Sequence, residues 1–206
     1  MEKKIISNII SLFPTSVYCS NLNRNLSKKE KFFIEELKKT PHKNTGNIRT
    51  KNSYVLEENK FKILKKDLIS LVEDYSNNVL QYINFIPFIT QSWINFTEET
   101  EYHHQHAHPN SIISGVFYMN ADEKNDKIFF FKNDNTTIVP NVKEYNIWNS
   151  SSWWIPIKTG DVVLFPSSLQ HMVETKKGTN TRTSLAFNVF AKGVFGENKT
   201  LTELKL

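Results

Sequence analysis

The sequence predicts a mainly β protein with some helix (α+β), in which short strands form a sandwich or barrel. Three observations support this class. Aromatic residues make up 13% of the 206 residues, short β-prone runs recur after residue 88, and turn-forming residues separate these runs. The expected strands are residues 89–96, 111–120, 127–131, 152–157, 161–165 and 182–190.

The first 87 residues are expected to supply one strand and two helices. The strand is predicted over residues 9–18, with a turn at Phe13-Pro14. Ser27 and Glu30 form a capping-box pattern, which predicts a helix that runs to about Lys39. Apolar residues at helical spacing over residues 60–83 predict a long amphipathic helix that supports a sheet.

The length of 206 residues fits a single domain, residues 1–206. Within it, we expect residues 1–87 to form the first strand and the helical support, and residues 88–192 to form the β core. Residues 193–206 are then a C-terminal tail. The polar, irregular segment 132–151 is long enough to act as a lid over an active site.

Composition narrows the classes of function. The net charge of +5 comes mainly from scattered lysines, and the three arginines form no stripe, so nucleic-acid binding is not indicated. The apolar run near the N-terminus is too short for a signal peptide or a membrane span, which favours a cytoplasmic protein. Cys19 is the only cysteine, so it has no internal disulfide partner, and its apolar surroundings predict a buried thiol.

Histidine is concentrated in two segments of the chain. Four histidines lie within six positions, at His103, His104, His106 and His108, and His171 follows a strand-like run. Two histidines one residue apart on a strand point to the same face. A third from a distant strand would complete one face of a metal ion, because neutral imidazole is a common ligand for iron, zinc and copper.

Arg182 begins an apolar strand about one strand beyond His171. No acidic residue is evident on its strand face, so we expect it to lack an internal partner. A buried guanidinium could then hold a carboxylate in a bidentate fork. Ser184, two residues further on, shares the face of Arg182 and could donate a second hydrogen bond.

Three motifs together resemble those of the Fe(II)/2-oxoglutarate-dependent oxygenases, and most closely a small group from marine bacteria and tailed phages. The pattern H-x-H-P-x-S followed by S-G-x-Y-Y stands here at residues 106–111 and 114–118, with Phe117 in place of the first tyrosine. The pattern G-D-x-x-x-F-P-S-x-x-x-H stands at residues 160–171, and R-x-S-x-x-F-N at residues 182–188. The resemblance covers most of the chain and implies a double-stranded β-helix of the jelly-roll or cupin-like type.

The resemblance also implies a metal site. His106, His108 and His171 would hold Fe(II), with His106 as the first ligand. His108 departs from the family, which usually places Asp or Glu at that position, and it makes the ligand set neutral. His103 and His104 are expected to line the pocket or to face solvent.

By the same resemblance, 2-oxoglutarate binds beside the metal. Arg182 would hold its C5 carboxylate, and Ser184, Tyr118 and Asn120 would line its binding site. Asn95 is a further pocket candidate.

The function implied is a dioxygenase that uses 2-oxoglutarate and O2, hydroxylates an unidentified substrate and releases succinate and CO2. If the gene belongs to a phage, the enzyme would act in the host cytoplasm, and a homodimer is compatible with the sequence. Two alternatives stay open. His108 favours a β-helix protein that binds a metal or a small acid without turnover, and a cupin-like metalloenzyme would not use 2-oxoglutarate. Arg182 and His171 disfavour the binding protein, and Arg182 also disfavours the cupin-like enzyme, because such an enzyme needs no carboxylate anchor there.

Overall fold

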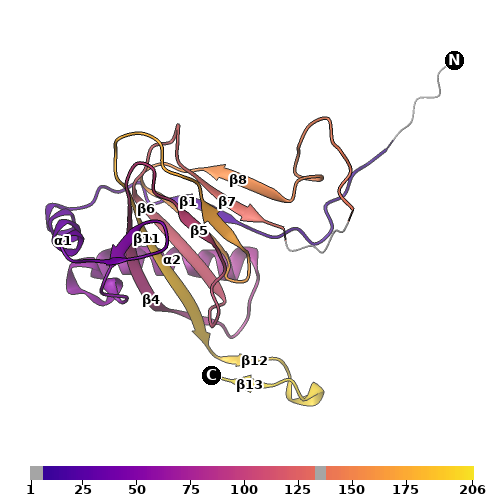
Figure 1. Ribbon diagram of the computed structural model, residues 1–206. Coiled ribbons are helices and arrows are strands. Elements are labelled where there is room, and N and C mark those ends of the chain that lie inside the picture. The colour runs from indigo at the N-terminus through magenta and orange to yellow at the C-terminus, as the bar shows by residue number, and fades with distance from the viewer. Residues whose placement is uncertain (1–6, 133–137) are drawn as a thin grey trace.

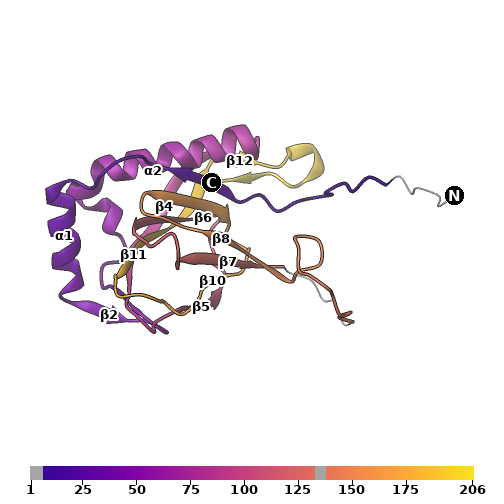
Figure 2. The same ribbon diagram turned by 90° about the horizontal axis from the view of Figure 1, so that it is seen from above.

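The protein is described by a computed structural model that covers residues 7–132 and 138–206. In this part of the chain the strands form a seven-stranded sheet, a four-stranded sheet and a two-stranded sheet. Figure 2 shows three layers: helix α2 (Lys62–Asp74) lies over one face of the large sheet, and the small sheet lies against the other face. This architecture confirms the predicted mainly β, jelly-roll class.

The seven-stranded sheet is antiparallel in every pairing and forms the centre of the molecule (Figure 1). Its strands, in spatial order, are β1 (Tyr18–Asn21), β9 (Asp161–Pro166), β6 (Ile113–Asn120), β11 (Arg182–Lys192), β4 (Ile86–Thr97), β3 (Ile48–Thr50) and β2 (Pro41–Lys43).

The four-stranded sheet carries histidines from both of the histidine-containing segments. In spatial order it contains β5 (His103–His106), β10 (His171–Val173), β7 (Lys127–Phe131) and β8 (Ser152–Pro156). A hairpin of β12 (Val194–Phe195) and β13 (Leu204–Lys205), with the 3-10 turn η4 (Asn198–Thr200) between them, extends beyond the end of β11 (Figure 1).

The two predicted helices are present. Helix α1 (Lys28–Lys38) begins at a complete capping box, in which Ser27 accepts from the Glu30 N–H and Glu30 accepts from the Ser27 N–H. Helix α2 follows the 3-10 turns η1 (Val55–Glu57) and η2 (Asn59–Phe61), and a π turn, η3 (Tyr75–Val79), extends it. The helical region ends before Ile83, which is 80% exposed, so the predicted helix is a few residues too long.

Alternation along the central strands divides the apolar core in two. On β9, Val162 and Leu164 pack with the helices, whereas Val163 and Phe165 pack toward the small sheet. On β11, Leu185, Phe187 and Val189 face the helices. The other face of β11 carries Arg182, Ser184, Ala186 and Asn188, which therefore look into the space between the two sheets.

Several local expectations are wrong. The first strand begins at Tyr18 rather than residue 9, because Phe13 adopts a left-handed φ of 57° just before Pro14. Strands β2 and β3 form where a polar, turn-rich segment was expected. Cys19 is exposed, because β1 is an edge strand.

The segment expected to act as a lid, residues 132–151, is described only in part. Residues 138–151 of the proposed lid form no strand or helix, while residues 133–137 of it lie outside the described part. Within the described residues, no helix is both long enough and apolar enough to span a bilayer.

Candidate active site

The structure brings His106, His108 and His171 together at the end of the space between the sheets. His106 and His171 are Cα partners across the antiparallel pair β5–β10, and His108 follows two residues after β5 ends. Each histidine offers a ring nitrogen, and these three atoms lie within 4.8 Å of one another. The ring centroids are 4.4 Å apart for His106 and His171, 4.9 Å for His106 and His108, and 5.2 Å for His108 and His171.

Main-chain carbonyls set which nitrogen two of these rings can offer. The Nδ1 of His106 lies 2.8 Å from the His104 carbonyl oxygen, and the Nδ1 of His171 lies 3.2 Å from that of Leu169. A carbonyl can only accept, so each Nδ1 carries the proton and each Nε2 has a free lone pair. Outer contacts of this kind orient histidine ligands in metal sites.

Burial keeps these imidazoles neutral. It lowers the pKa of His108 to about 4 and that of His171 to about 3, and nearby histidines contribute in the same direction. Burial also lowers the pKa of His106. Neutral rings with free lone pairs are the form that binds a metal, so the site suits a cation far better than a proton near pH 7.

His103 and His104 lie beside this triad rather than at a distance from it. Together with His106 they form a second group whose nitrogens lie within 4.8 Å of one another. Burial, followed by the neighbouring His106, lowers the pKa of His103 to about 3. Asn47 faces His103, with 3.3 Å between the Asn47 Nδ2 and the His103 Nδ1.

A pocket continues from the histidines along the inner faces of β4, β6 and β11. Trp93 and Asn95 come from β4, Tyr118 from β6 and Ser184 from β11, where Ser184 and Tyr118 are Cα partners. Trp93 stacks on His108, with 5.8 Å between ring centroids and 22° between ring planes. Three of the sequence-predicted candidates, Asn95, Tyr118 and Ser184, therefore line one pocket with the triad.

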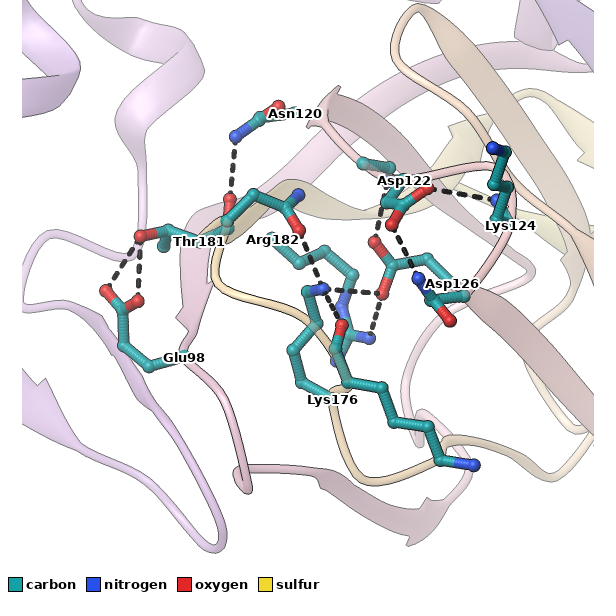
Figure 3. Close-up of polar contacts among 12 residues, drawn as sticks. Glu98, Asn120, Asp122, Lys124, Asp126, Lys176, Thr181 and Arg182 are labelled. Atoms are coloured by element: carbon teal, nitrogen blue, oxygen red, sulfur yellow. Dashed lines mark hydrogen bonds and ion pairs between the residues drawn. The ribbon is translucent and has the colours of Figure 1, made fainter.

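Arg182 is only 3% exposed and lies near His103 and Tyr118 without lining this pocket, and the prediction that it lacks an acidic partner is wrong. Its Nη1 donates to Asp126 Oδ1 at 2.9 Å (Figure 3). Asp126 precedes β7 in a tight turn, and its Oδ2 accepts from the Asp122 N–H at 2.8 Å. The ion pair joins two residues that are 56 positions apart in sequence. The residues on the strand face of Arg182 therefore give no sign of it.

Lys176 is a second buried cation at the same carboxylate. Its Nζ lies 3.8 Å from Asp126 Oδ1 and donates to Asn180 Oδ1 at 2.9 Å (Figure 3). The side chains of Lys176 and Asp126 are both 0% exposed. Two buried cations thus share one buried carboxylate, and the carboxylate of the partly exposed Asp122 is close enough to Lys176 for the two charges to interact.

Two buried donors at this end of the site have no hydrogen-bond partner among the described residues. They are the Nη2 of Arg182 and the hydroxyl of Tyr118. Arg182 is close enough to Tyr118 to act on its pKa, although burial dominates and raises that pKa strongly, so the phenol stays protonated. Unsatisfied buried polar groups are rare in native proteins. Two neighbouring donors that lack a partner, one of them on a cation, suit a carboxylate.

Asn120 does not join this pocket. It is exposed, its Nδ2 donates to the Thr181 carbonyl at 2.8 Å, and it lines a separate surface hollow with Thr183 (Figure 3). The register between β6 and β11 shifts between Thr183 and Ser184, which separates Asn120 from the inner face that Tyr118 occupies. The structure therefore does not bring Asn120 to the pocket that Tyr118 and Ser184 line.

The donor set fits a first-row divalent metal. Three neutral imidazoles suit iron, zinc or copper equally well by ligand type. Together they would fill only one side of the coordination sphere of a metal. The free donors of Arg182 and Tyr118 lie close to the histidine cluster, where they could orient a small dicarboxylate against such a metal.

Comparison with known proteins agrees with this geometry. Residues 91–188 match the family model described as "Putative 2OG-Fe(II) oxygenase", and this range contains all three histidines and Arg182. No curated protein matches the sequence.

Solved structures share the fold at low sequence identity. HygX from Streptomyces hygroscopicus, solved with nickel, 2-oxoglutarate and hygromycin B, has a TM-score of 0.59 at 12% identity, covering 85% of this chain and 82% of that one. The 2-oxoglutarate-dependent epimerase SnoN from nogalamycin biosynthesis has a TM-score of 0.59 at 8% identity, covering 89% and 82%. The carbocyclase SnoK from the same biosynthesis has a TM-score of 0.58 at 11% identity, covering 86% and 80%.

Proposed function

We propose that the protein is a 2OG-Fe(II) oxygenase in which His106, His108 and His171 hold Fe(II), and that it hydroxylates a substrate still to be identified; the match of residues 91–188 to the family model and the histidine cluster support this. Bound Fe(II) would supply the redox chemistry in which O2 converts 2-oxoglutarate to succinate and CO2 and oxidises the substrate. We further propose that this takes place in the cytoplasm.

One combination of features carries the proposal: two buried donors without a hydrogen-bond partner among the described residues, one of them on the charged Arg182, lie close to the histidine cluster. The histidines offer neutral rings, with Nε2 free on His106 and His171. The two donors are the Arg182 Nη2 and the Tyr118 hydroxyl. A metal alone would explain the first feature and an anion alone the second, whereas a metal-bound dicarboxylate explains both.

The ion pair with Asp126 changes how Arg182 would act. Asp126 accepts from the Arg182 Nη1 and neutralises the charge of the guanidinium, so Arg182 does not need the co-substrate as a counter-ion. Support comes instead from the Arg182 Nη2, a buried donor on a charged group that has no partner among the described residues. Asp126 would then orient the guanidinium, while Nη2, Tyr118 and Ser184 would meet the far carboxylate of 2-oxoglutarate.

The ligand set supports one distinct alternative. A triad of neutral histidines gives the metal no anionic protein ligand, so a protein that binds metal and 2-oxoglutarate without turnover also agrees with the site. A metalloenzyme that does not use 2-oxoglutarate agrees less well, because it would leave the buried Arg182 Nη2 and Tyr118 hydroxyl without an acceptor.

The test is an anaerobic titration of the protein with Fe(II) and then 2-oxoglutarate, followed by addition of O2 and measurement of succinate. Binding of both ligands and release of succinate, even without a primary substrate, would support the oxygenase. Binding of both without succinate would favour the non-catalytic alternative. Iron binding that is unaffected by loss of His171 would overturn the proposed metal site.

A further inference from the structure

His108 is held in a different way from the other two proposed ligands. His106 and His171 each point a ring N–H at a carbonyl oxygen two residues earlier in the chain. The His108 ring is instead enclosed by side chains, with Trp93 stacked on it and Asn188 lining the same hollow, close enough to raise the pKa of His108 against the stronger lowering by burial. His108 is also the residue that stands where the family usually has a carboxylate, so what orients it matters most.

Asn188 faces the same side of β11 as Ser184 and Ala186, because it follows the regular alternation of the strand and pairs in register with Ser114 of β6. The irregularity lies on the neighbouring strand β4, where Thr90 and Gln91 together oppose Asn188. A bulge of this kind bends the bulged strand locally. Asn188 is 9% exposed and lines a cavity of about 400 Å³ together with His108 and Thr90, and its own carbonyl accepts from the Thr90 hydroxyl at 3.2 Å.

A chain of three serine hydroxyls leads to Asn188. The Ser111 hydroxyl donates to the carbonyls of Ile113 and Val189, so it can only accept from Ser167, at 2.8 Å. Because the single hydrogen of Ser167 goes to Ser111, Ser167 accepts from the Ser114 hydroxyl at 2.8 Å. The Ser114 hydroxyl also lies 3.5 Å from Asn188 Oδ1, so Ser114 packs against the Asn188 side chain. Ser114 and Ser167 are each 1% exposed, so water does not compete for these hydroxyls.

The same serine chain also fixes the backbone of His108. The His108 N–H donates to the Ser167 carbonyl at 2.9 Å, and the Ser167 N–H donates to the Ile112 carbonyl at 3.1 Å. Ser167 therefore holds His108 at its main chain, and through Ser114 it limits where the Asn188 side chain beside the His108 ring can lie. Ser111, Ser114, Ser167 and Asn188 come from the three separate motifs of the sequence, and this network gives the polar positions of those motifs a shared role.

We propose that Asn188 is a positioning residue that accepts the His108 ring N–H, held in place by the Ser111–Ser167–Ser114 hydroxyl chain, so that the opposite ring nitrogen faces the metal. This rests on the proposed metal site. A side-chain acceptor does for His108 what main-chain carbonyls do for His106 and His171. Unlike those carbonyls, it can be removed or strengthened by substitution.

The experiment measures Co(II) affinity by competition with a chelator, with the visible Co(II) bands reporting coordination. Asn188→Leu should lower the affinity by about 10–100-fold, as for other outer contacts of metal-binding histidines. Asn188→Asp should bind at least as tightly as the wild type, because a carboxylate is a stronger acceptor for the ring N–H. Ser114→Ala should lie between the wild type and Asn188→Leu. Asn78→Leu serves as the control, because Asn78 bonds only Asp74 on the exposed side of the helical layer.

Two further measurements separate the possible failures. Nitrogen NMR of the zinc-loaded protein should show a single tautomer for His108 in the wild type and mixed tautomers in Asn188→Leu. If His108→Ala leaves Co(II) affinity unchanged, the metal site itself is wrong. If His108→Ala weakens binding but Asn188→Leu does not, only the role of Asn188 is wrong. Should Asn188→Leu fail to fold, Asn188→Asp decides alone, and weaker binding than the wild type would overturn the inference.

Discussion

His106 and His171 are direct Cα partners across β5 and β10, and their ring centroids lie 4.4 Å apart. The two residues are 65 positions apart in sequence, yet the register of one short antiparallel pair places both rings on one face. Their Nδ1 atoms each meet a carbonyl oxygen, which directs both Nε2 lone pairs toward the same region. The metal site therefore depends on the pairing of two strands of four and three residues.

Replacement of His171 by alanine should remove iron without unfolding the protein. The loss of a ligand should exceed the cost of losing an outer contact, so Fe(II) affinity should fall by more than about 100-fold. The side chain sits at the first residue of a short strand, so the thermal midpoint of the metal-free protein should change little. Iron stoichiometry and thermal unfolding measure both effects. His42→Ala, on exposed β2, is the matched control, and an unchanged iron content in His171→Ala would refute the assignment.

Acid should both destabilise the metal-free protein and release the metal. His108 has a pKa of about 4 and His171 of about 3 in the folded protein, against an ordinary value near 6.5, because burial disfavours the charged ring. Between these values the unfolded chain binds more protons than the folded chain, so the free energy of unfolding falls as pH drops below about 6.5. The full contribution is present above that pH.

Urea denaturation of the metal-free protein between pH 5 and pH 7.5 measures this effect. His171→Gln should flatten the dependence, because glutamine does not titrate. This window lies above the range in which buried or paired carboxylates titrate, such as Glu98, whose pKa is lowered. A stability that stays constant or rises toward pH 5 would contradict the prediction.

The sequence was sufficient to predict most of the sheet, because alternation and turn residues are local signals. The expected strand at residues 127–131 matches β7, and those at 161–165 and 182–190 fall within β9 and β11. Strands β5 and β10 carry too few apolar residues to show such a pattern; they form because the rest of the sheet fixes their ends. The first strand was misplaced because Phe13 and Pro14 interrupt an apolar run that otherwise resembles a strand.

At the site, residues next to one another in sequence were easier to predict than partners across the fold. The histidine spacing indicated the triad, and Arg182 was correctly expected at the start of an inward-facing strand. Asp126 and Lys176 stand in turn-like segments, where a charged residue usually faces solvent, so nothing local indicated that they are buried. Asn120 shows the converse, because a register shift that the sequence does not reveal moves it out of the pocket.

Gly115→Ala should destabilise the fold, because the ring of Phe187 occupies the space that a Cβ would need. A Cβ built at Gly115 lies 2.2 Å from the Phe187 Cζ. Forcing extra volume into a packed core costs about 1–3 kcal/mol. Urea denaturation of Gly115→Ala measures the cost, and the double variant with Phe187→Leu should recover part of it. An unaltered unfolding midpoint in Gly115→Ala would show that the ring can move without penalty.

Arg182→Ala should raise the KM for 2-oxoglutarate far more than it lowers kcat. Loss of one side of a buried charged hydrogen-bonded pair costs about 2–5 kcal/mol, which corresponds to a change of roughly 30- to 5,000-fold. The variant also leaves Asp126 with only Lys176 as a counter-charge, so its stability must be measured alongside. Arg182→Lys should recover the stability better than the affinity, because lysine neutralises Asp126 but lacks the second donor arm. If direct titration shows wild-type affinity for 2-oxoglutarate in Arg182→Ala, the anchor role is wrong.

Tyr118→Phe should separate a binding role of the hydroxyl from a structural one. The Tyr118 hydroxyl is buried without a partner among the described residues, and an unsatisfied buried group costs about 1–3 kcal/mol. Its removal should therefore leave the ligand-free protein as stable as the wild type or more stable. The same change should weaken 2-oxoglutarate, because a hydrogen bond to a charged carboxylate is worth about 1.5–3 kcal/mol.

Tyr75→Phe is the matched control for this prediction. Tyr75 is equally buried, but its hydroxyl donates to the Ser16 carbonyl at 3.0 Å, so its loss should destabilise the fold and leave 2-oxoglutarate affinity unchanged. Urea denaturation and anaerobic titration of both variants give the two readouts. If Tyr118→Phe behaves like Tyr75→Phe, the Tyr118 hydroxyl serves the fold, and the carboxylate must be held by Arg182 and Ser184 without it.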